Sequence, residues 1–287
     1  MTNIGKTMAL GFCAILIVTG CTREALMSPE ADNAAAVTLF GNLQNGAQHT
    51  FGWVPAPASE LAKIPYALDK RTALPASFLI GGPPIGNQGS QGSCVAWGTA
   101  YTGRSILKQE QSGGAFSAST NEFSPAYVYD QIKIGSGCGG GSYVTSALSL
   151  LKTQGVCTLA SMPYTTTCSA LPTTALKTQA ATFKINGYSL VTITPTAVKT
   201  QIAAGHAVIV AGPVDNNFEN LPSGQVLTTY NPKKYLGGHC YVAIGYDDSK
   251  QAFKIQNQWG TSWSSAGYAW ISYNLIGTIW QEAYTLN

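Results

Sequence analysis

The chain has 287 residues, which is enough for one large domain or two modest ones. Charged residues make up 10% of the sequence and hydrophobic residues 45%, so the chain can bury a sizeable core and disorder is excluded for most of it. The net charge is only +3 and no run of three or more Lys or Arg occurs. This pattern excludes the basic stripe of a nucleic-acid-binding protein, and we expect no nucleic-acid partner.

The N-terminus reads as a secretory signal over residues 1–20. Its apolar stretch, Met8 to Val18, is too short to span a bilayer, which takes ~20 residues, but it fits a signal-peptide core. The following Val-Thr-Gly-Cys resembles a bacterial lipobox, which implies that Cys21 is acylated and becomes the first residue. By the same resemblance, Thr22 favours the outer membrane of a bacterial envelope. The alternative is an ordinary secretory signal with a chance cysteine.

After the signal and the lipid site, five cysteines remain for the folded chain: Cys94, Cys138, Cys157, Cys168 and Cys240. In an oxidising compartment an odd number leaves at least one thiol unpaired, which is worth considering as reactive. We expect Cys157 to pair with Cys168, because so short a loop can close without strain. For Cys138 and Cys240, a mutual bridge and two buried thiols both stay open. No metal-ligand spacing occurs and the histidines are scattered, so we expect neither a metal nor a cofactor.

The distribution of turn formers and apolar residues predicts helices first and strands second. Residues 81–93 form a loop, and a helix is expected from Cys94 to about Gln109, with its N-cap near Ser93. Two further helices are expected, one beginning at Ser124-Pro125 and one over Ser146–Leu151. From Val191 onward the pattern favours strands, at Ala207–Ala211, Tyr241–Tyr246, Ala252–Gln256 and Tyr268–Tyr273. This order indicates an α+β protein whose two halves can face each other across a cleft.

The cysteine at the start of the first helix is a candidate nucleophile. Cys94 would lie in the field of the helix dipole, which favours the thiolate. A thiolate needs a histidine to take up and return a proton. His49 lies in the leader and His206 is explained as a turn residue, so His239, at the start of a predicted strand, is the candidate partner.

A hairpin supplies a third residue. If the strand after His239 turns at Asp247-Asp248 and returns through 252–257, His239 and Asn257 face each other. An asparagine amide there can accept the imidazole N–H and fix the tautomer of the ring. The spacing therefore predicts a Cys-His-Asn arrangement.

Several segments together resemble papain-like (C1) cysteine peptidases. They are the nucleophile, glycine, proline-tyrosine, histidine and asparagine segments, at 87–97, 138–141, 162–164, 237–247 and 255–268, in the order of the family. The resemblance covers about residues 74–287. It implies a two-lobed fold, with an N-terminal helical lobe, a C-terminal antiparallel β lobe and the active site in the cleft between them.

The resemblance also implies roles for individual residues. Cys94 would be the nucleophile, His239 the general base and acid, and Asn257 the residue that orients His239. Gln88 would donate its side-chain N–H to the oxyanion hole, and Trp259 would shield the His–Asn hydrogen bond.

The same resemblance implies a substrate-binding set. Gly140 and Gly141 would offer backbone groups to an extended peptide. Gly238 and Trp259 complete this set.

The sequence departs from the family at three places. Gln91 stands where a cysteine usually pairs with the equivalent of Cys138, and Val95 stands where tryptophan is usual. The segment before the peptidase domain is much shorter than the helical propeptide of eukaryotic members. The resulting division is a signal peptide at 1–20, a tether and short leader at 21–73, and a peptidase domain at 74–287.

The leader carries one apolar cluster, Phe51-Gly52-Trp53, which should bury itself somewhere. It could be a strap in a groove on the back of the domain or a plug in the active-site cleft. Because no inhibitory propeptide motif is visible, we expect the strap.

The sequence therefore indicates a monomeric cysteine endopeptidase that acts on protein or peptide substrates and is attached to the membrane through Cys21. One alternative is a papain-fold binding protein without catalysis, but all four candidate catalytic residues are present. The other is a cell-wall amidase of the smaller Cys–His hydrolase fold, against which the asparagine segment and the domain length argue.

Overall fold

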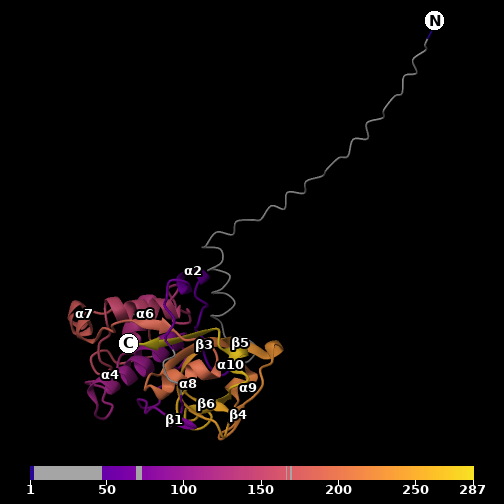
Figure 1. Ribbon diagram of the computed structural model, residues 1–287. Coiled ribbons are helices and arrows are strands. Elements are labelled where there is room, and N and C mark those ends of the chain that lie inside the picture. The colour runs from indigo at the N-terminus through magenta and orange to yellow at the C-terminus, as the bar shows by residue number, and fades with distance from the viewer. Residues whose placement is uncertain (3–46, 69–72, 166, 169) are drawn as a thin grey trace.

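The computed structural model describes residues 1–2, 47–68, 73–165, 167–168 and 170–287. Figure 1 shows two lobes side by side, one built mainly of helices and the other of strands. The two-lobed α+β arrangement expected from the sequence is confirmed. The predicted signal peptide and the lipid site at Cys21 fall outside the described residues. Within the part of the chain that the structure describes, no helix has the length and apolar character needed to cross a membrane.

One continuous helical stretch links the two lobes. It consists of α3 (Cys94–Ala96), a π-helical segment η1 (Trp97–Arg104) and α4 (Ser105–Ser112). Its start at Cys94, with Ser93 as N-cap, confirms the prediction. η1 packs against the long strand of the β lobe, where a Cβ on Gly98 would lie 2.9 Å from Cys240 Sγ. A glycine at position 98 therefore lets the helix approach the strand that carries the candidate histidine.

The other helices of the first lobe are α5 (Pro125–Ile132), α6 (Val144–Thr153), α7 (Thr174–Ala180) and η2 (Ala181–Phe183). The first two confirm the predicted helices. Ser124 caps α5 by accepting the Tyr127 N–H, and Pro125 occupies the first helical position, where its missing N–H costs nothing. The second lobe adds the helices α8 (Pro195–Ala203), α9 (Asn216–Glu219), η3 (Pro232–Lys234) and α10 (Ile276–Ile279).

The β lobe is one mixed sheet with the strand order β2-β8-β3-β5-β6-β7-β4, and β1 pairs with β5 outside this path. The strands are β1 (Ser77–Leu79), β2 (Tyr188–Leu190), β3 (Val208–Asp215), β4 (Val226–Leu227), β5 (Tyr235–Asp247), β6 (Ala252–Gln256), β7 (Tyr268–Ser272) and β8 (Glu282–Leu286). The four predicted strands correspond to β3, β5, β6 and β7. The other four are short or at the chain end, and the sequence pattern did not reveal them.

The hairpin formed by β5 and β6 differs from the prediction in its register. Val242 pairs with Gln256, and a bulge lies between Ala243 and Gly245. The hairpin is therefore centred at Ser249, one residue beyond the predicted turn, and Asn257 is not directly opposite His239. The backbone N–H of Asn257 instead donates to the Gly267 carbonyl (3.0 Å), which continues the register of β6 on β7.

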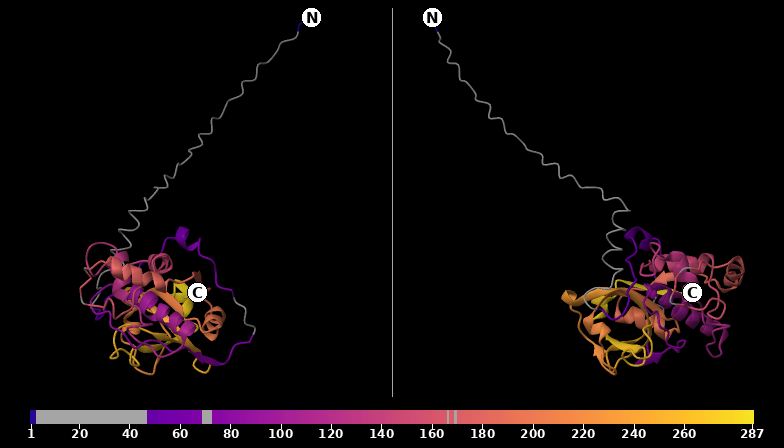
Figure 2. Two further views of the ribbon diagram at one scale, coloured as in Figure 1. Left: turned by 90° about the vertical axis from the view of Figure 1, so that its left-hand side faces the viewer. Right: turned by 180° about the vertical axis from the view of Figure 1, so that it is seen from behind.

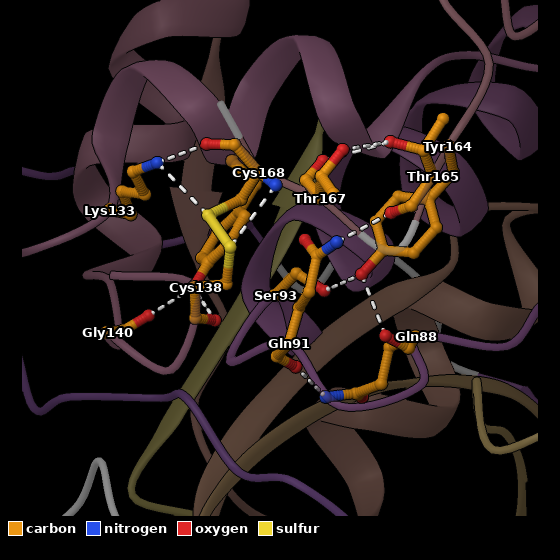
Figure 3. Close-up of a disulfide and its surroundings, with 11 residues drawn as sticks. Gln88, Gln91, Ser93, Lys133, Cys138, Gly140, Tyr164, Thr165, Thr167 and Cys168 are labelled. Atoms are coloured by element: carbon orange, nitrogen blue, oxygen red, sulfur yellow. Dashed lines mark hydrogen bonds between the residues drawn. A yellow bond between two sulfur atoms is a disulfide. The ribbon is translucent and has the colours of Figure 1, made fainter. Parts of the chain in front are cut away.

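The disulfide prediction was wrong. Cys138 pairs with Cys168, whereas Cys157 and Cys240 are buried thiols, so a Cys138–Cys240 bridge is also excluded. Figure 3 shows Cys168 held beside α5, where Lys133 Nζ donates to the Cys168 carbonyl. The length of a loop indicates which two cysteines can be joined without straining the chain. It does not indicate which two side chains point toward each other, because the direction of each side chain depends on the surrounding core.

Candidate active site

His239 and Asn257 form a direct hydrogen bond. His239 Nε2 lies 2.8 Å from Asn257 Oδ1, and both side chains are buried. The amide oxygen can only accept, so His239 Nε2 carries the proton and Nδ1 has its lone pair free. Nδ1 is buried and has no hydrogen-bond partner within the described residues. The asparagine thus fixes the tautomer in which Nδ1 can take up a proton.

Cys94 lies at the first position of α3 and is completely buried. The backbone of Cys240, the neighbour of His239, hydrogen-bonds to the Cys94 side chain. This contact places the thiol next to the segment of β5 that carries the histidine. The sequence separates Cys94 from His239 by more than half of the chain, and the packing of α3 and η1 on β5 brings Cys94 close to the strand that carries His239.

Trp259 covers the histidine. Its ring stacks on His239 with centroids 4.5 Å apart and planes inclined by 28°. Gln258, the residue before it, donates from Nε2 to the Cys240 carbonyl (2.8 Å), which holds this segment against β5. Trp259 therefore lies where the sequence analysis placed a shield for the His239–Asn257 bond.

Gln88 is fixed in the cleft by its backbone and its side chain. Its N–H donates to the Gln258 carbonyl (2.9 Å), and its carbonyl accepts the Tyr164 hydroxyl (2.8 Å; Figure 3). The side-chain Nε2 donates to the carbonyl oxygens of Gln91 and Thr50, both at 2.9 Å. Gln88 Nε2, the side-chain donor predicted from the sequence, is therefore in the cleft, and it is hydrogen-bonded to the carbonyl of Thr50 in the leader.

The leader occupies the cleft, so the expectation of a strap on the back of the domain was wrong. The N–H groups of Gly52 and Trp53 both donate to the Gly238 carbonyl (3.0 Å each) on the β lobe. On the helical lobe, the Ser142 N–H donates to the Gly52 carbonyl (2.7 Å) and the Val54 N–H donates to the Ser142 carbonyl (3.1 Å). Figure 1 and the right-hand view of Figure 2 show α2 (Ala58–Leu61), just after this segment, over the junction of the lobes.

The apolar cluster is buried against the candidate catalytic residues. Phe51 is 1% exposed and meets His239 edge-on, with ring centroids 6.0 Å apart. A Cβ on Gly237 would lie 2.5 Å from the Phe51 ring, so that glycine makes room for the phenyl group. A cleft between two lobes offers an apolar side chain more surface to pack against than the back of either lobe. The shape of the cleft could not be predicted from the sequence.

Gly52 is the point of closest approach between leader and domain. A Cβ at this position would lie 1.9 Å from the Gly92 carbonyl oxygen, which is a hard collision with backbone. No side chain fits there unless the leader moves away. The backbone of Gly52 also lies close enough to the Cys94 side chain to lower the pKa of the thiol against the effect of burial, so this part of the leader is next to the thiol.

The covered site is electrically neutral. Burial raises the pKa of Cys94 to about 12, although backbone hydrogen bonds from Cys240 and Gly52 oppose the rise. Burial also lowers the pKa of His239 to about 3, against the opposing effect of the Asn257 hydrogen bond. With the leader in place, the pair is a thiol and a neutral imidazole at physiological pH, and not an ion pair.

The two glycines expected to pair with a peptide lie beside the leader. The Gly140 carbonyl accepts the Tyr129 hydroxyl (2.6 Å), and the Gly141 carbonyl accepts the Ile134 N–H (2.9 Å). The backbone pairing with the leader is made by the next residue, Ser142. Gly141 still matters, because a Cβ there would lie 2.7 Å from the Gly52 carbonyl oxygen.

Two buried glutamates, which the sequence analysis missed, hold the leader at either end of the cleft. Glu219 Oε1 accepts the backbone N–H groups of Gln48 (2.8 Å) and His49 (3.0 Å). Glu282 Oε1 accepts the Ala56 N–H (2.7 Å), and burial raises the pKa of Glu282. Neither residue belongs to a motif, so only the fold reveals that they face the cleft. Among the described residues, no group of three or more His, Cys, Asp or Glu could hold a metal ion.

Comparisons with known proteins agree with this geometry. The family described as "Papain family cysteine protease" matches residues 64–284. The gamete and mating-type specific protein A of Dictyostelium discoideum is 32% identical over 191 residues, which cover 64% of this chain and 39% of that protein. Chymopapain of Carica papaya is 30% identical over 196 residues, covering 64% and 50%. The chain thus aligns with about half or less of the length of these two relatives.

Two solved structures show the same fold. Xylellain, a cysteine protease from Xylella fastidiosa, superposes with a TM-score of 0.73 at 21% identity, covering 86% of this chain and 98% of that one. Digestive procathepsin L 3 of Tenebrio molitor superposes with a TM-score of 0.64 at 19% identity, covering 89% and 78%.

Proposed function

Because this chain belongs to the papain family of cysteine proteases, we propose that it is a cysteine endopeptidase, made in a latent form, that uses Cys94, His239, Asn257 and Gln88. The observation that carries the proposal is the His239–Asn257 hydrogen bond at 2.8 Å. It leaves Nδ1 as the proton acceptor in a site where a buried thiol and a buried amide donor already stand.

Once the leader leaves, water reaches the site and the ion pair can form. Cys94 passes its proton to His239 Nδ1, and the thiolate attacks the carbonyl carbon of a bound peptide. The negative charge that develops on the carbonyl oxygen is stabilised by Gln88 Nε2 and the Cys94 backbone N–H. His239 then returns the proton to the leaving amine. Water, deprotonated by His239, releases the acyl group and restores the thiol.

The leader supports the proposal because its backbone occupies these positions. It is extended, it hydrogen-bonds to both lobes, and its Thr50 carbonyl accepts from Gln88. The same contacts explain latency, because the donor, the thiol and the histidine are all covered at once.

Selective labelling and hydrolysis test the proposal. The full chain carrying Gly52→Leu, which cannot dock the leader, should hydrolyse casein and lose activity when one equivalent of iodoacetamide modifies Cys94. Cys94→Ala and His239→Ala in this background should fold, as judged by circular dichroism, and be inactive. A folded Gly52→Leu chain that binds peptides but never cleaves them, or a Cys94→Ala chain of undiminished activity, would contradict the assignment.

We also propose that Cys21 carries a lipid that anchors the chain to the outer membrane. The support is the sequence: an apolar stretch of signal length followed directly by the Val-Thr-Gly-Cys pattern. The multiple acyl chains of such an anchor hold firmly, whereas a single chain binds marginally. Cys21→Ser should abolish incorporation of labelled palmitate and release the chain from the outer-membrane fraction. Unchanged fractionation without palmitate uptake would contradict the proposal.

A further inference from the structure

Within the described part of the leader, His49 packs its ionisable side chain against an acid and an aromatic ring of the domain. His49 Nδ1 lies 3.2 Å from Glu219 Oε1, and its ring stacks on Trp259 with centroids 4.2 Å apart and planes inclined by 11°. Stacking on an indole together with a carboxylate is a favourable environment for a cationic, planar group.

The Glu219 carboxylate is buried, and its partners within the domain do not explain why. The side chain is 2% exposed, and within the described part of the chain the hydrogen bonds that its carboxylate accepts come from Gln48 and His49 of the leader. When the leader leaves, these donors leave with it, and a carboxylate sunk in the wall of the cleft needs new ones. A substrate is the molecule that takes the leader's place.

The position of Glu219 and Trp259 relative to a bound substrate follows from the proposed chemistry, on which this inference rests. His239 must protonate the amine that leaves, so the residues after the scissile bond lie on the His239 side of Cys94. Trp259 stacks on His239, and His49 of the leader stacks on Trp259. The carbonyl of Thr50, the residue after His49, accepts the hydrogen bond from Gln88 Nε2. Glu219 and Trp259 therefore face the leaving-group side of a bound peptide.

There is room beside Glu219 for a side chain longer than histidine. A hollow of about 510 Å³ is lined by Glu219, Trp263 and Ser264, and the leader residues Gln48 and His49 also line it.

We propose that Glu219 and Trp259 form a subsite for a cationic side chain, so that this peptidase prefers peptides with Arg or Lys within two residues after the scissile bond. The side chain would stack on Trp259 and place its charge on Glu219. The leader satisfies the same subsite with His49.

Internally quenched peptides that differ only in arginine or citrulline test this preference. Citrulline keeps the shape and loses the charge, and the two peptide series carry it at the first and at the second position after the scissile bond. The full chain with Gly52→Leu should cleave the arginine peptide of one series at least tenfold faster in kcat/KM than its citrulline partner. Added salt should lower the rate for the arginine peptide and leave the citrulline peptide unchanged.

A second pair of variants locates the preference. Adding Glu219→Gln should reduce the arginine-to-citrulline ratio to within twofold of one, because the arginine peptide then loses its charged partner. Adding Glu282→Gln, the matched buried glutamate at the other end of the cleft, should leave the ratio intact. Cleavage with equal rates for arginine and citrulline, or a ratio that survives Glu219→Gln, would overturn the subsite and leave the proposed peptidase standing. Absence of any peptide cleavage would overturn both.

Discussion

The side-chain amide of Gln88 donates a hydrogen bond to the carbonyl oxygen of Thr50 at 2.9 Å. Thr50 belongs to the leader and Gln88 to the nucleophile loop, so the leader uses the very donor that the proposed chemistry needs. A carbonyl at this position stands in for the oxygen of a substrate. We therefore expect inhibition by the leader to be competitive with substrate and reversible by displacement.

Displacing the leader should activate the full chain. Gly52→Leu places a side chain where a Cβ would lie 1.9 Å from the Gly92 carbonyl, so the docked segment cannot persist. We expect kcat/KM on a fluorogenic peptide to rise at least tenfold and the melting temperature to fall, because the buried surface of Phe51 and Trp53 is lost. The matched control is Gly81→Leu, where a Cβ meets nothing within 4 Å. Equal activity of the two variants would show that the docked leader does not restrain the enzyme.

The docking equilibrium should depend on pH through His239. Its pKa is about 3 under the leader and returns toward the ordinary 6.5 when water enters. Below pH 6.5, His239 binds a proton in the open state but stays neutral in the docked state. The equilibrium constant for docking therefore falls by up to tenfold per pH unit. Cys94 has the opposite sign at high pH, since its docked pKa of about 12 lies above the ordinary value. The leader should therefore be held most tightly near neutral pH.

Glu282 opposes this effect and must be removed to measure it. Burial raises its pKa, so it binds a proton more readily in the docked state and favours docking as the pH falls. In a chain with Cys94→Ala and Glu282→Gln, hydrogen-exchange protection of residues 47–56 should fall roughly 30-fold from pH 7.5 to pH 5. His239→Ala should remove that slope. Protection that holds steady or rises on acidification would refute the role of the histidine.

The candidate residues should differ in kind as well as in size of effect. In the Gly52→Leu background, Gln88→Ala should lower kcat by ~10²–10³ with little change in KM, because an oxyanion donor acts mainly in the transition state. Asn257→Ala should be milder than His239→Ala, since it orients the ring and does not react. Steady-state kinetics separate these outcomes. A Gln88→Ala enzyme altered in KM alone would assign the glutamine to substrate binding.

Much of the fold follows from patterns that are local in the sequence. The helix that begins at Cys94 is marked by a change from turn formers to periodic apolar residues, and strands β5 and β6 by short apolar runs. The short strands β1 and β4 carry too few residues for a pattern. They exist because a neighbouring long strand offers its edge, which is a property of the assembled sheet.

The site was predictable where a chemical role requires a residue type. Cysteine, histidine and asparagine each have few substitutes for their roles, so their spacing has meaning. Glu219 and the docked position of Phe51 have no such signature. Their roles depend on the shape of a cleft that forms only when residues far apart in the chain come together.

The disulfide supports the wall of the cleft. Cys138 and Cys168 are 30 residues apart, and the Cys138 carbonyl accepts the Gly92 N–H (2.9 Å) and the Tyr129 hydroxyl (2.6 Å). Replacing both cysteines by serine should cost about 3.5 kcal/mol of unfolding free energy in the loop-entropy model, measured by urea denaturation. Because the Gly52 segment of the leader packs on Gly92, loss of the bridge should also weaken docking of the leader. The double variant should therefore have a higher basal activity than the wild-type chain.

Reductant should lower the melting temperature of the wild type and leave that of the double variant unchanged. A double variant as stable as the wild type would contradict the bridge. Cys157→Ser is the control for a buried thiol outside the bridge: it keeps the Cys138–Cys168 disulfide, so reductant should lower its melting temperature as much as it lowers that of the wild type.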